Sequence, residues 1–277
     1  MSVVLAALTS DPNLLRCELH RLSSQVLLQG AQRSNAVGVG TYAQDEVLLR
    51  RFASDGELTL DLLVPPHESE ALLFHAGRLP VGLSLEDNTQ PFRARRWLFA
   101  HQGVVNGFEQ LRGPLLESLP DHLQRQVRGG TDSEVLFALF LRQLRHLGRT
   151  DDPRLEARVV GRMLVDTARE VAKVATEQGV TRTSTLNLVA TNGFVLAACR
   201  YGEEALFYAR LEGSAECEPC GVTPGTPETQ PEVGAHRRQR TVVVASHLKR
   251  LAGWVELPQG TTLVVGKDLQ VAHLNEA

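Results

Sequence analysis

Apolar positions along this chain change from a strand-like period to a helix-like period and back again. In the first hundred residues, short apolar segments bounded by polar residues, glycine or proline predict strands. These expected strands are 2–8, 38–42, 47–52, 71–75 and 97–101, and the second and third form a hairpin. Because chain termini usually fray, an apolar strand that begins at residue 2 suggests that this terminus is held in place for a purpose.

The middle of the chain carries a helical pattern. Residues 108–119 predict a helix that ends before Pro120, and a longer helix begins at Thr131 and ends at Gly148. The pair Thr131 and Glu134 has the spacing of a capping box, in which each side chain bonds a backbone N–H at the start of the helix. A further helix is expected over 155–178, packed beside the previous one.

Strand-like segments return in the last third, at 185–191, 194–201, 206–211, 241–246, 261–265 and 270–273. Asn192-Gly193 predicts a hairpin with a type I′ turn, which requires positive φ at both residues. The segment 213–239 is rich in proline, glycine and glutamate, and we expect a flexible insertion there. Strands, then helices, then strands predict an α+β fold, with residues 1–277 forming a single domain.

Composition excludes several classes of protein. The 277 residues are 43% hydrophobic and 22% charged, with a formal net charge of −3, which is typical of a globular protein and offers no basic surface for nucleic acid. The apolar N-terminal segment is too short for a signal peptide, and no segment reaches the ~20 apolar residues of a membrane span. We therefore expect a cytoplasmic protein with neither nucleic-acid nor membrane partners.

The four cysteines are too few and too scattered for a disulfide framework. Cys217-x-x-Cys220 has the spacing of half a zinc site or of a redox pair, and His236 is the nearby imidazole. A second pair is lacking, and the surrounding loop is not the strand-to-helix junction of a thioredoxin motif. We therefore expect chance placement, with no metal ligands and no cofactor.

A series of short motifs carries a family resemblance. In chain order they are Asn35-x-x-Gly38-x-Gly40, Phe74-His75-Ala76, Asn88-Thr89-Gln90-Pro91-Phe92, Phe99-Ala100-His101-Gln102-Gly103, Gly130-Thr131-Asp132-Ser133-Glu134, Leu186-Asn187, Asn192-Gly193, Arg200-Tyr201, Ala245-Ser246 and Trp254. The series resembles the class II glutamine amidotransferases, which are N-terminal-nucleophile hydrolases. It is most similar to the stand-alone branch that includes the ergothioneine-pathway γ-glutamyl hydrolases. The resemblance implies a four-layer αββα sandwich.

The resemblance also assigns the chemistry, and this chain departs from it at the nucleophile. In the family, residue 2 is a cysteine that becomes N-terminal when Met1 is removed, and its α-amine is the base, with a pKa of about 7.7–8.0. This chain has Ser2, whose hydroxyl is a much poorer nucleophile than a thiol. Two interpretations stay open, a serine nucleophile or a residue without a chemical role.

The oxyanion hole differs as well. The family uses His-Asn-Gly, in which the asparagine amide and the glycine N–H donate to the developing oxyanion. Here Gln102 and Gly103 occupy these positions, and the extra methylene of glutamine moves the amide by about 1.5 Å. The alternative for Gln102 is an ordinary turn residue.

Substrate binding is implied for Asp132, which matches the family aspartate that holds the α-ammonium of glutamine, with Gly130 and Thr131 beside it. The alternative is a carboxylate that only interacts with the helix dipole. Arg78 corresponds to the arginine that grips the α-carboxylate, but it comes one residue late, which on a strand reverses the direction of a side chain. A bulge at Gly77 would restore that direction.

Three functional hypotheses follow. Because nucleophile, oxyanion donor and carboxylate clamp act as a unit, their joint change favours a catalytically degenerate protein that acts as a binding, regulatory or assembly subunit. Such a protein would bind an amino acid or γ-glutamyl ligand and an unidentified protein partner. The alternative is an active Ser2-dependent amidohydrolase or amidotransferase that cleaves glutamine or a γ-glutamyl amide. An amidase with a different acyl substrate ranks last, because Asp132 is retained.

Overall fold

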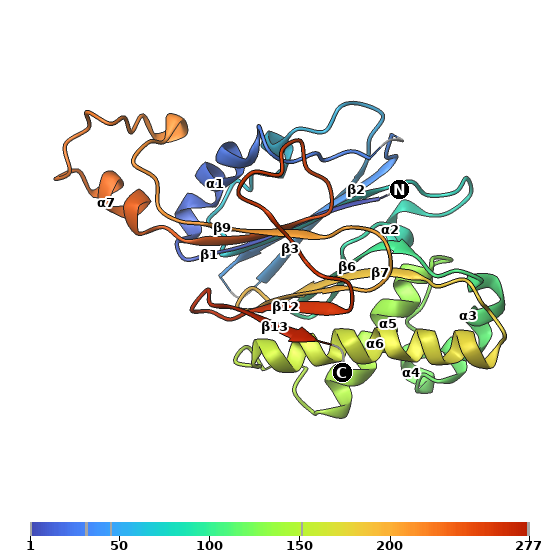
Figure 1. Cartoon of the computed structure of the whole chain (residues 1–277). Helices are drawn as coiled ribbons and strands as arrows, with labels where there is room; N and C mark the ends of the chain where they lie inside the picture. Colours follow the sequence, from blue (N-terminus) through green and yellow to red (C-terminus); the bar gives the residue numbers. More distant parts are fainter. Residues whose placement is uncertain (1, 31–32, 45, 151, 276–277) are drawn as a thin grey trace.

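The computed structural model describes residues 2–30, 33–44, 46–150 and 152–275, and two antiparallel sheets that face each other form its centre (Figure 1). The seven-stranded sheet has the order β11 (Val255–Glu256), β9 (Phe207–Leu211), β10 (Thr241–Ala245), β1 (Val3–Thr9), β4 (Ala71–Gly77), β2 (Ala36–Ala43) and β3 (Glu46–Ala53). The six-stranded sheet has the order β13 (Val271–Asn275), β12 (Thr261–Val265), β8 (Leu196–Arg200), β7 (Thr185–Thr191), β6 (Trp97–Val104) and β5 (Phe92–Ala94).

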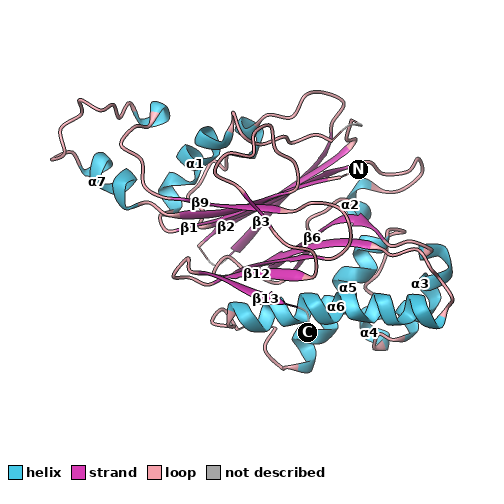
Figure 2. Cartoon of the chain, viewed as in Figure 1, coloured by secondary structure: helices cyan, strands magenta, loops and turns pink. Residues whose placement is uncertain are grey.

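Helices cover the outer face of each sheet (Figure 2). Two long helices, α5 (Asp132–His146) and α6 (Ala157–Glu177), pack on the six-stranded sheet, with α3 (Phe108–Glu117) and α4 (Asp121–Gln124) beside them. The outer face of the seven-stranded sheet carries η1 (Pro12–Leu14), α1 (Leu15–Leu22) and η2 (Leu60–Leu63). The result is the four-layer αββα sandwich that the sequence predicted.

The N-terminal strand β1 lies in the middle of its sheet, between β10 and β4. Val3, Leu5 and Ala7 pack under α1, whereas the residues between them pack against the facing sheet. Both faces of β1 are therefore buried, which is why its sequence is apolar at nearly every position instead of alternating. The predicted N-terminal strand is confirmed, and it places Ser2 at the end of a fixed element.

Five aromatic side chains join the helical layer to the six-stranded sheet. Phe140 of α5 contacts both Trp97 and Phe99 of β6, with ring centroids 5.6 Å apart in each pair. Phe137, one turn earlier, stacks on Phe99 and Phe92. These contacts fix α5, and with it Asp132, relative to the end of β6.

Two local predictions were wrong. The Asn192-Gly193 hairpin exists, but its turn is not type I′, because only Gly193 has positive φ (90°) and Asn192 does not. Thr191 pairs with Leu196, so the connection is four residues long, and the Asn192 side chain closes it by accepting from two following N–H groups. The expected single C-terminal sheet is also divided, since β10 belongs to one sheet and β12 to the other.

The segment 213–239 contains more structure than its composition suggested. It holds η3 (Glu218–Cys220) and α7 (Pro231–Arg238), which lie beyond the end of β9 and return the chain to β10. Its flexibility stays a prediction. Nowhere in the described parts of the chain does a helix combine the length and apolar character needed to cross a bilayer.

Candidate active site and ligand pocket

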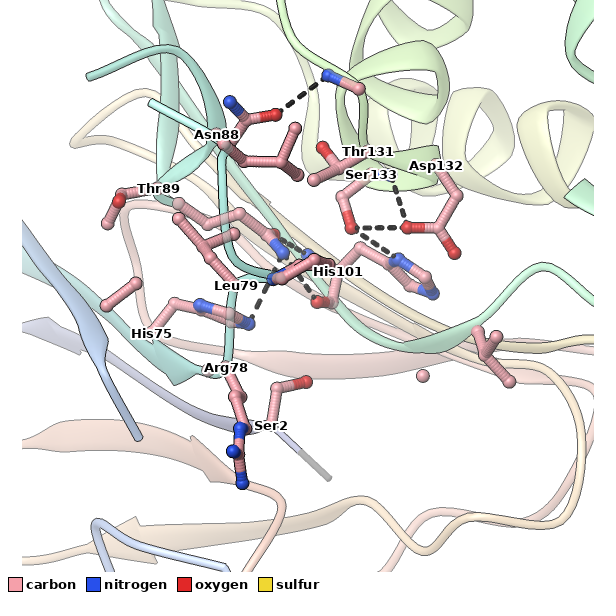
Figure 3. Close-up of a pocket in the computed structure, with 18 of the residues that line it drawn as sticks. Ser2, His75, Arg78, Leu79, Asn88, Thr89, His101, Thr131, Asp132 and Ser133 are labelled. Carbon is pink, nitrogen blue, oxygen red and sulfur yellow. Dashed lines mark hydrogen bonds between the residues drawn. The ribbon is translucent and has the colours of Figure 1, made fainter. Parts of the chain in front are cut away.

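A cavity of about 610 Å³ opens where the start of β1, the ends of β4 and β6 and the beginning of α5 meet (Figure 3). It brings together six of the seven residues that the sequence pointed to: Ser2, Arg78, Gly103, Gly130, Thr131 and Asp132. These residues come from segments up to 130 positions apart, so only the fold unites them. Gln102 is not among the lining residues.

Gln102 lies on β6 with its side chain between the two sheets. Successive residues of a strand point to opposite faces, and His101 points to α5, where its ring contacts Ser133. Gln102 therefore points between the sheets, where it is 1% exposed and its Oε1 accepts a hydrogen bond from Asn187 Nδ2 at 2.6 Å. A role for Gln102 as an oxyanion donor, through its Nε2, stays a prediction.

Gly103, the next residue, meets a steric requirement. Its φ of 142° is rarely adopted by residues with a side chain, and a Cβ there would lie 2.0 Å from the carbonyl oxygen of Thr185. Only glycine fits, so the backbone of β6 passes close to β7 at the edge of the cavity. The expected oxyanion role of the Gly103 N–H is a separate question, and it stays a prediction.

Asp132 is the first residue of α5, and its carboxylate closes a turn at the cavity wall. Its Oδ2 accepts from the Val105 N–H at 2.9 Å, and its Oδ1 accepts from the Ser133 N–H at 2.7 Å. The Ser133 hydroxyl also donates to Oδ1 at 3.1 Å, so the remaining acceptor capacity lies mainly on Oδ2. The ammonium-binding role of Asp132 stays a prediction.

The loop in front of Asp132 is held by a buried carboxylate. Glu134 accepts from the N–H groups of Arg128 and Gly129 at 2.9 and 2.6 Å, while Asn88 accepts from the Gly130 N–H. Burial raises the pKa of Glu134, and the two N–H donors oppose that shift. The predicted capping box is therefore wrong in both parts, because Glu134 bonds the N–H groups of Arg128 and Gly129 and Thr131 makes no capping bond. The Thr131 hydroxyl oxygen is buried at the cavity and has no hydrogen-bond partner among the residues that the structure describes.

A glutamine and two histidines form the floor of the cavity. Gln90 bonds the backbone of His101 on both sides, accepting from its N–H at 2.6 Å and donating to its carbonyl at 3.1 Å. The same amide nitrogen lies 3.3 Å from His75 Nε2. Burial, reinforced by the neighbouring His101, lowers the pKa of His75 to about 3, so this ring is neutral near pH 7.

The tautomer of His101 follows from its partners. Its Nε2 lies 3.0 Å from the carbonyl oxygen of Thr185, which can only accept, so Nε2 carries the proton. Its Nδ1 lies 2.9 Å from the Ser133 hydroxyl, which also donates to Asp132 Oδ1 at 3.1 Å. Gln90, His75 and Ser133 lie within the sequence motifs, but the motifs predicted no role for them. A motif gives the order of residues and does not say which side chains contact one another.

Ser2 and Arg78 lie beside each other at the mouth of the cavity (Figure 3). Ser2 is half-buried, and a Cβ added to Gly77 would lie 3.5 Å from the Ser2 Cβ. The bulge at Gly77 that would have restored the direction of Arg78 is absent, since β4 pairs regularly with β2 up to Gly77 opposite Ala36. Arg78 reaches the cavity for another reason: it follows the last residue of β4, so the pleat no longer dictates its direction.

Ser2 carries a hydroxyl group, precedes a buried N-terminal strand and faces a cavity at the edge of two stacked sheets. This arrangement matches the expected family. The chain belongs to the class-II glutamine amidotransferases, whose family pattern matches residues 38–276. The fold is that of the N-terminal-nucleophile amidotransferases.

The chain is also similar to individual proteins, in sequence or in fold. The chain is 26% identical over 229 residues to the probable glutamine amidotransferase DUG3 of Saccharomyces cerevisiae, a match that covers 77% of this chain and 62% of the yeast protein. A class-II domain protein from Silicibacter pomeroyi has a similar structure, with a TM-score of 0.58 and 22% identity over 99% of both chains. A predicted glutamine amidotransferase from Pseudomonas aeruginosa has a TM-score of 0.57 and 19% identity over 98% of both chains.

Proposed function

We propose that this chain is a catalytically degenerate class II glutamine amidotransferase domain, which keeps an amino-acid pocket and acts as a binding, regulatory or assembly subunit. One observation carries the proposal: a serine, Ser2, lines the cavity at the nucleophile position, while Gln102 is not among the lining residues and its Oε1 is bonded to Asn187. The nucleophile and the amide donor are therefore both altered relative to the family pattern.

The energetic cost of these changes supports the proposal. Removal of one oxyanion donor costs roughly 2.7–4 kcal/mol in other acyl-transfer enzymes, which is about a 100- to 1000-fold loss of rate. Replacement of a thiol by a hydroxyl adds to this loss, because a thiol is already a few per cent thiolate at neutral pH. Efficient glutamine hydrolysis is not expected from this combination.

The pocket itself retains the charges that an amino acid requires. Asp132 offers carboxylate oxygens at one wall, and Arg78 offers a guanidinium at the mouth beside Ser2. An α-ammonium would bind to Asp132 and an α-carboxylate to Arg78, which places a γ-amide near Ser2. Glutamine or a γ-glutamyl compound is the proposed ligand, and a separate protein is the proposed partner.

The second candidate is an active amidohydrolase with Ser2 as nucleophile, and the position of Ser2 in the cavity favours it. This mechanism requires Ser2 to be N-terminal, so that its α-amine serves as the base. Met1 lies outside the described residues, and intact mass therefore decides the point.

One set of variants separates the two candidates. Glutamate release from glutamine is measured for the wild type, Ser2→Ala, Ser2→Cys and the double variant Ser2→Cys with Gln102→Asn, together with the intact mass of each. The degenerate subunit predicts no turnover in the wild type and a gain in the double variant that exceeds Ser2→Cys alone. Wild-type turnover that Ser2→Ala abolishes would refute degeneracy and establish the enzyme.

Ligand binding is tested separately by titration calorimetry with glutamine. Asp132→Asn should weaken binding at least tenfold, whereas Asp121→Asn, an exposed aspartate at the start of another helix, should not change it. If glutamine does not bind to the wild type, the pocket assignment is wrong even though the family is right.

A further inference from the structure

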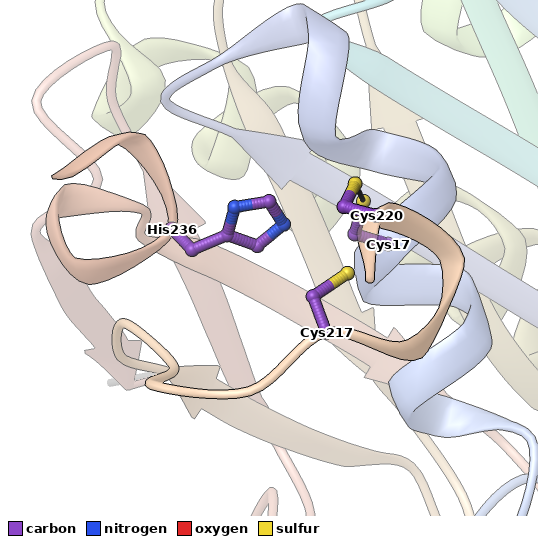
Figure 4. A group of neighbouring side chains, drawn as sticks. All are labelled: Cys17, Cys217, Cys220 and His236. Carbon is purple, nitrogen blue, oxygen red and sulfur yellow. Dashed lines mark hydrogen bonds between the residues drawn. The ribbon is translucent and has the colours of Figure 1, made fainter. Parts of the chain in front are cut away.

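Three cysteines and one histidine from three separate segments meet at the opposite end of the fold from Ser2 (Figure 4). Cys17 lies on α1, Cys217 and Cys220 flank the turn at η3, and His236 lies on α7. One ligand atom from each of the four lies within 4.8 Å of the other three, and the sulfurs of Cys17 and Cys220 are 3.4 Å apart. Cys17, Cys217 and His236 are buried, and Cys220 is exposed.

The histidine is oriented as a ligand. Its Nδ1 lies 2.8 Å from the carbonyl oxygen of Glu232, which can only accept, so Nδ1 carries the proton and Nε2 carries the lone pair. His236 is 3% exposed, and its Nε2 has no hydrogen-bond partner among the described residues. An unpaired buried ring nitrogen is costly, whereas metal-bound histidines commonly donate their other N–H to a backbone carbonyl.

The turn that carries Cys217 and Cys220 brings both sulfurs to one side. Cys217 and Val222 exchange two backbone hydrogen bonds of 2.9 Å, which closes the turn. Gly221 completes it with a φ of 67°, a value that favours glycine. The C-x2-C spacing lies within the C-x2–4-C range that is typical of structural zinc sites.

We propose that Cys17, Cys217, Cys220 and His236 bind one Zn²⁺ ion in a tetrahedral structural site. A tetrahedron with Zn–S bonds of about 2.3 Å separates its sulfurs by about 3.8 Å, close to the spacing of this cluster. The three thiols release their protons on binding, and the neutral imidazole supplies Nε2, so the bound site has a charge of −1. Thiolates with one imidazole in a closed tetrahedron favour Zn²⁺ over Mg²⁺ or Ca²⁺, which prefer oxygen ligands.

The proposed ion would hold the segment 213–239 onto α1. Apart from the ligands, the apolar contact among the described residues of α1, the preceding η1 and this segment is a small cluster that includes Leu14, Val222 and Val233. The polar links are weak, since His20 and Glu218, 3.1 Å apart, are both solvent-exposed. A metal would therefore contribute most of the energy that orders this segment, which the sequence alone presented as flexible.

The test starts with the full-length wild-type protein, purified under reducing conditions and supplied with Zn²⁺. Metal content by plasma mass spectrometry should be about one zinc per chain, and X-ray absorption should give three sulfurs at about 2.3 Å and one nitrogen at about 2.0 Å. Cobalt substitution should produce the thiolate charge-transfer bands and intense visible bands of a tetrahedral site.

Variants identify the ligands. Cys17→Ser, Cys217→Ser and His236→Ala should each lose the metal and become sensitive to proteolysis within 213–239. The control Cys199→Ala removes a buried cysteine outside the cluster, and it should retain both metal and resistance.

Two results with the wild-type protein would overturn the proposal. The first is that the reduced protein binds no zinc. The second is that the freshly isolated protein has an intact mass two hydrogens below that of the reduced chain, and that the difference maps to a Cys17–Cys220 disulfide. A coordination shell without the nitrogen would remove His236 and refute the proposed site.

Discussion

His75 gives a prediction that can be worked through from the structure. The ring is buried beneath the cavity, and burial lowers its pKa from 6.5 to about 3. In the unfolded chain the same imidazole titrates near 6.5, so the unfolded state binds a proton first as the pH falls. His75 therefore contributes stability that is present above pH 6.5 and is lost as the pH falls toward 3.

The magnitude follows from linkage. Each pH unit between the two pKa values costs about 1.4 kcal/mol, so this histidine alone lowers the free energy of unfolding by about 3 kcal/mol between pH 6.5 and about pH 4.5. That is a large fraction of the 5–15 kcal/mol by which proteins are typically stable. The value is an upper limit, because any relaxation that hydrates the ring reduces it.

The variant His75→Gln tests the reasoning, because an amide oxygen can replace Nε2 as the acceptor for Gln90 and does not titrate. Urea unfolding is measured at pH 7 and at about pH 4.5 for the wild type, for His75→Gln and for the control His122→Gln, which changes an exposed histidine. The wild type and His122→Gln should lose about 3 kcal/mol more than His75→Gln on acidification. Equal losses in all three proteins would mean that His75 takes up its proton in the folded state, and the buried neutral ring would be refuted.

Three further changes have expected outcomes, each measured by urea unfolding at pH 7. Gly38→Ala should destabilise the protein by about 3 kcal/mol, because its Cβ would lie 2.0 Å from the Gln90 carbonyl oxygen, whereas Gly113→Ala, in an open helical position, should stabilise it by about 0.5–1 kcal/mol. Glu134→Gln should lower the free energy of unfolding by about 1.5–3 kcal/mol and weaken glutamine binding, because two backbone N–H groups lose their carboxylate acceptor. An unchanged stability would show that the loop keeps its conformation without this carboxylate. Phe140→Ala should lower the free energy of unfolding by about 3–5 kcal/mol, because it leaves a cavity in the core. The control Leu147→Ala changes a half-exposed residue at the end of the same helix and should cost less than about 1 kcal/mol. Similar losses in both variants would contradict the packing argument.

Local chemistry could be predicted well in this chain. The stripe of apolar residues from Val135 to Leu144 predicts a helix packed on a sheet, and α5 buries those residues. Glycine and proline mark the ends of the elements, and the motif around Asp132 predicts a carboxylate at the start of a helix. These features depend on residues a few positions apart, which the order of the sequence displays directly.

The same local reasoning could not give the direction of Gln102. Its conformation depends on Asn187, which stands opposite it on β7 in the register of the six-stranded sheet. Nothing in the spacing of the two motifs states that register. The role of Gln90 beneath His101 and His75 was hidden for the same reason.

The cysteines show most clearly which contacts the sequence reveals and which only the fold reveals. Cys217 and Cys220 were visible as a pair because two residues separate them, and His236 was visible because it follows in the same segment. Cys17 lies 203 positions from Cys220 along the chain, and their sulfurs are 3.4 Å apart in space.

By itself, the sequence determined the order and faces of strands and helices and the family to which they belong, because periodicity and short motifs are local. Which distant side chains share a cavity or a metal site was decided only by the tertiary structure, because the packing of two sheets and their helices sets those distances.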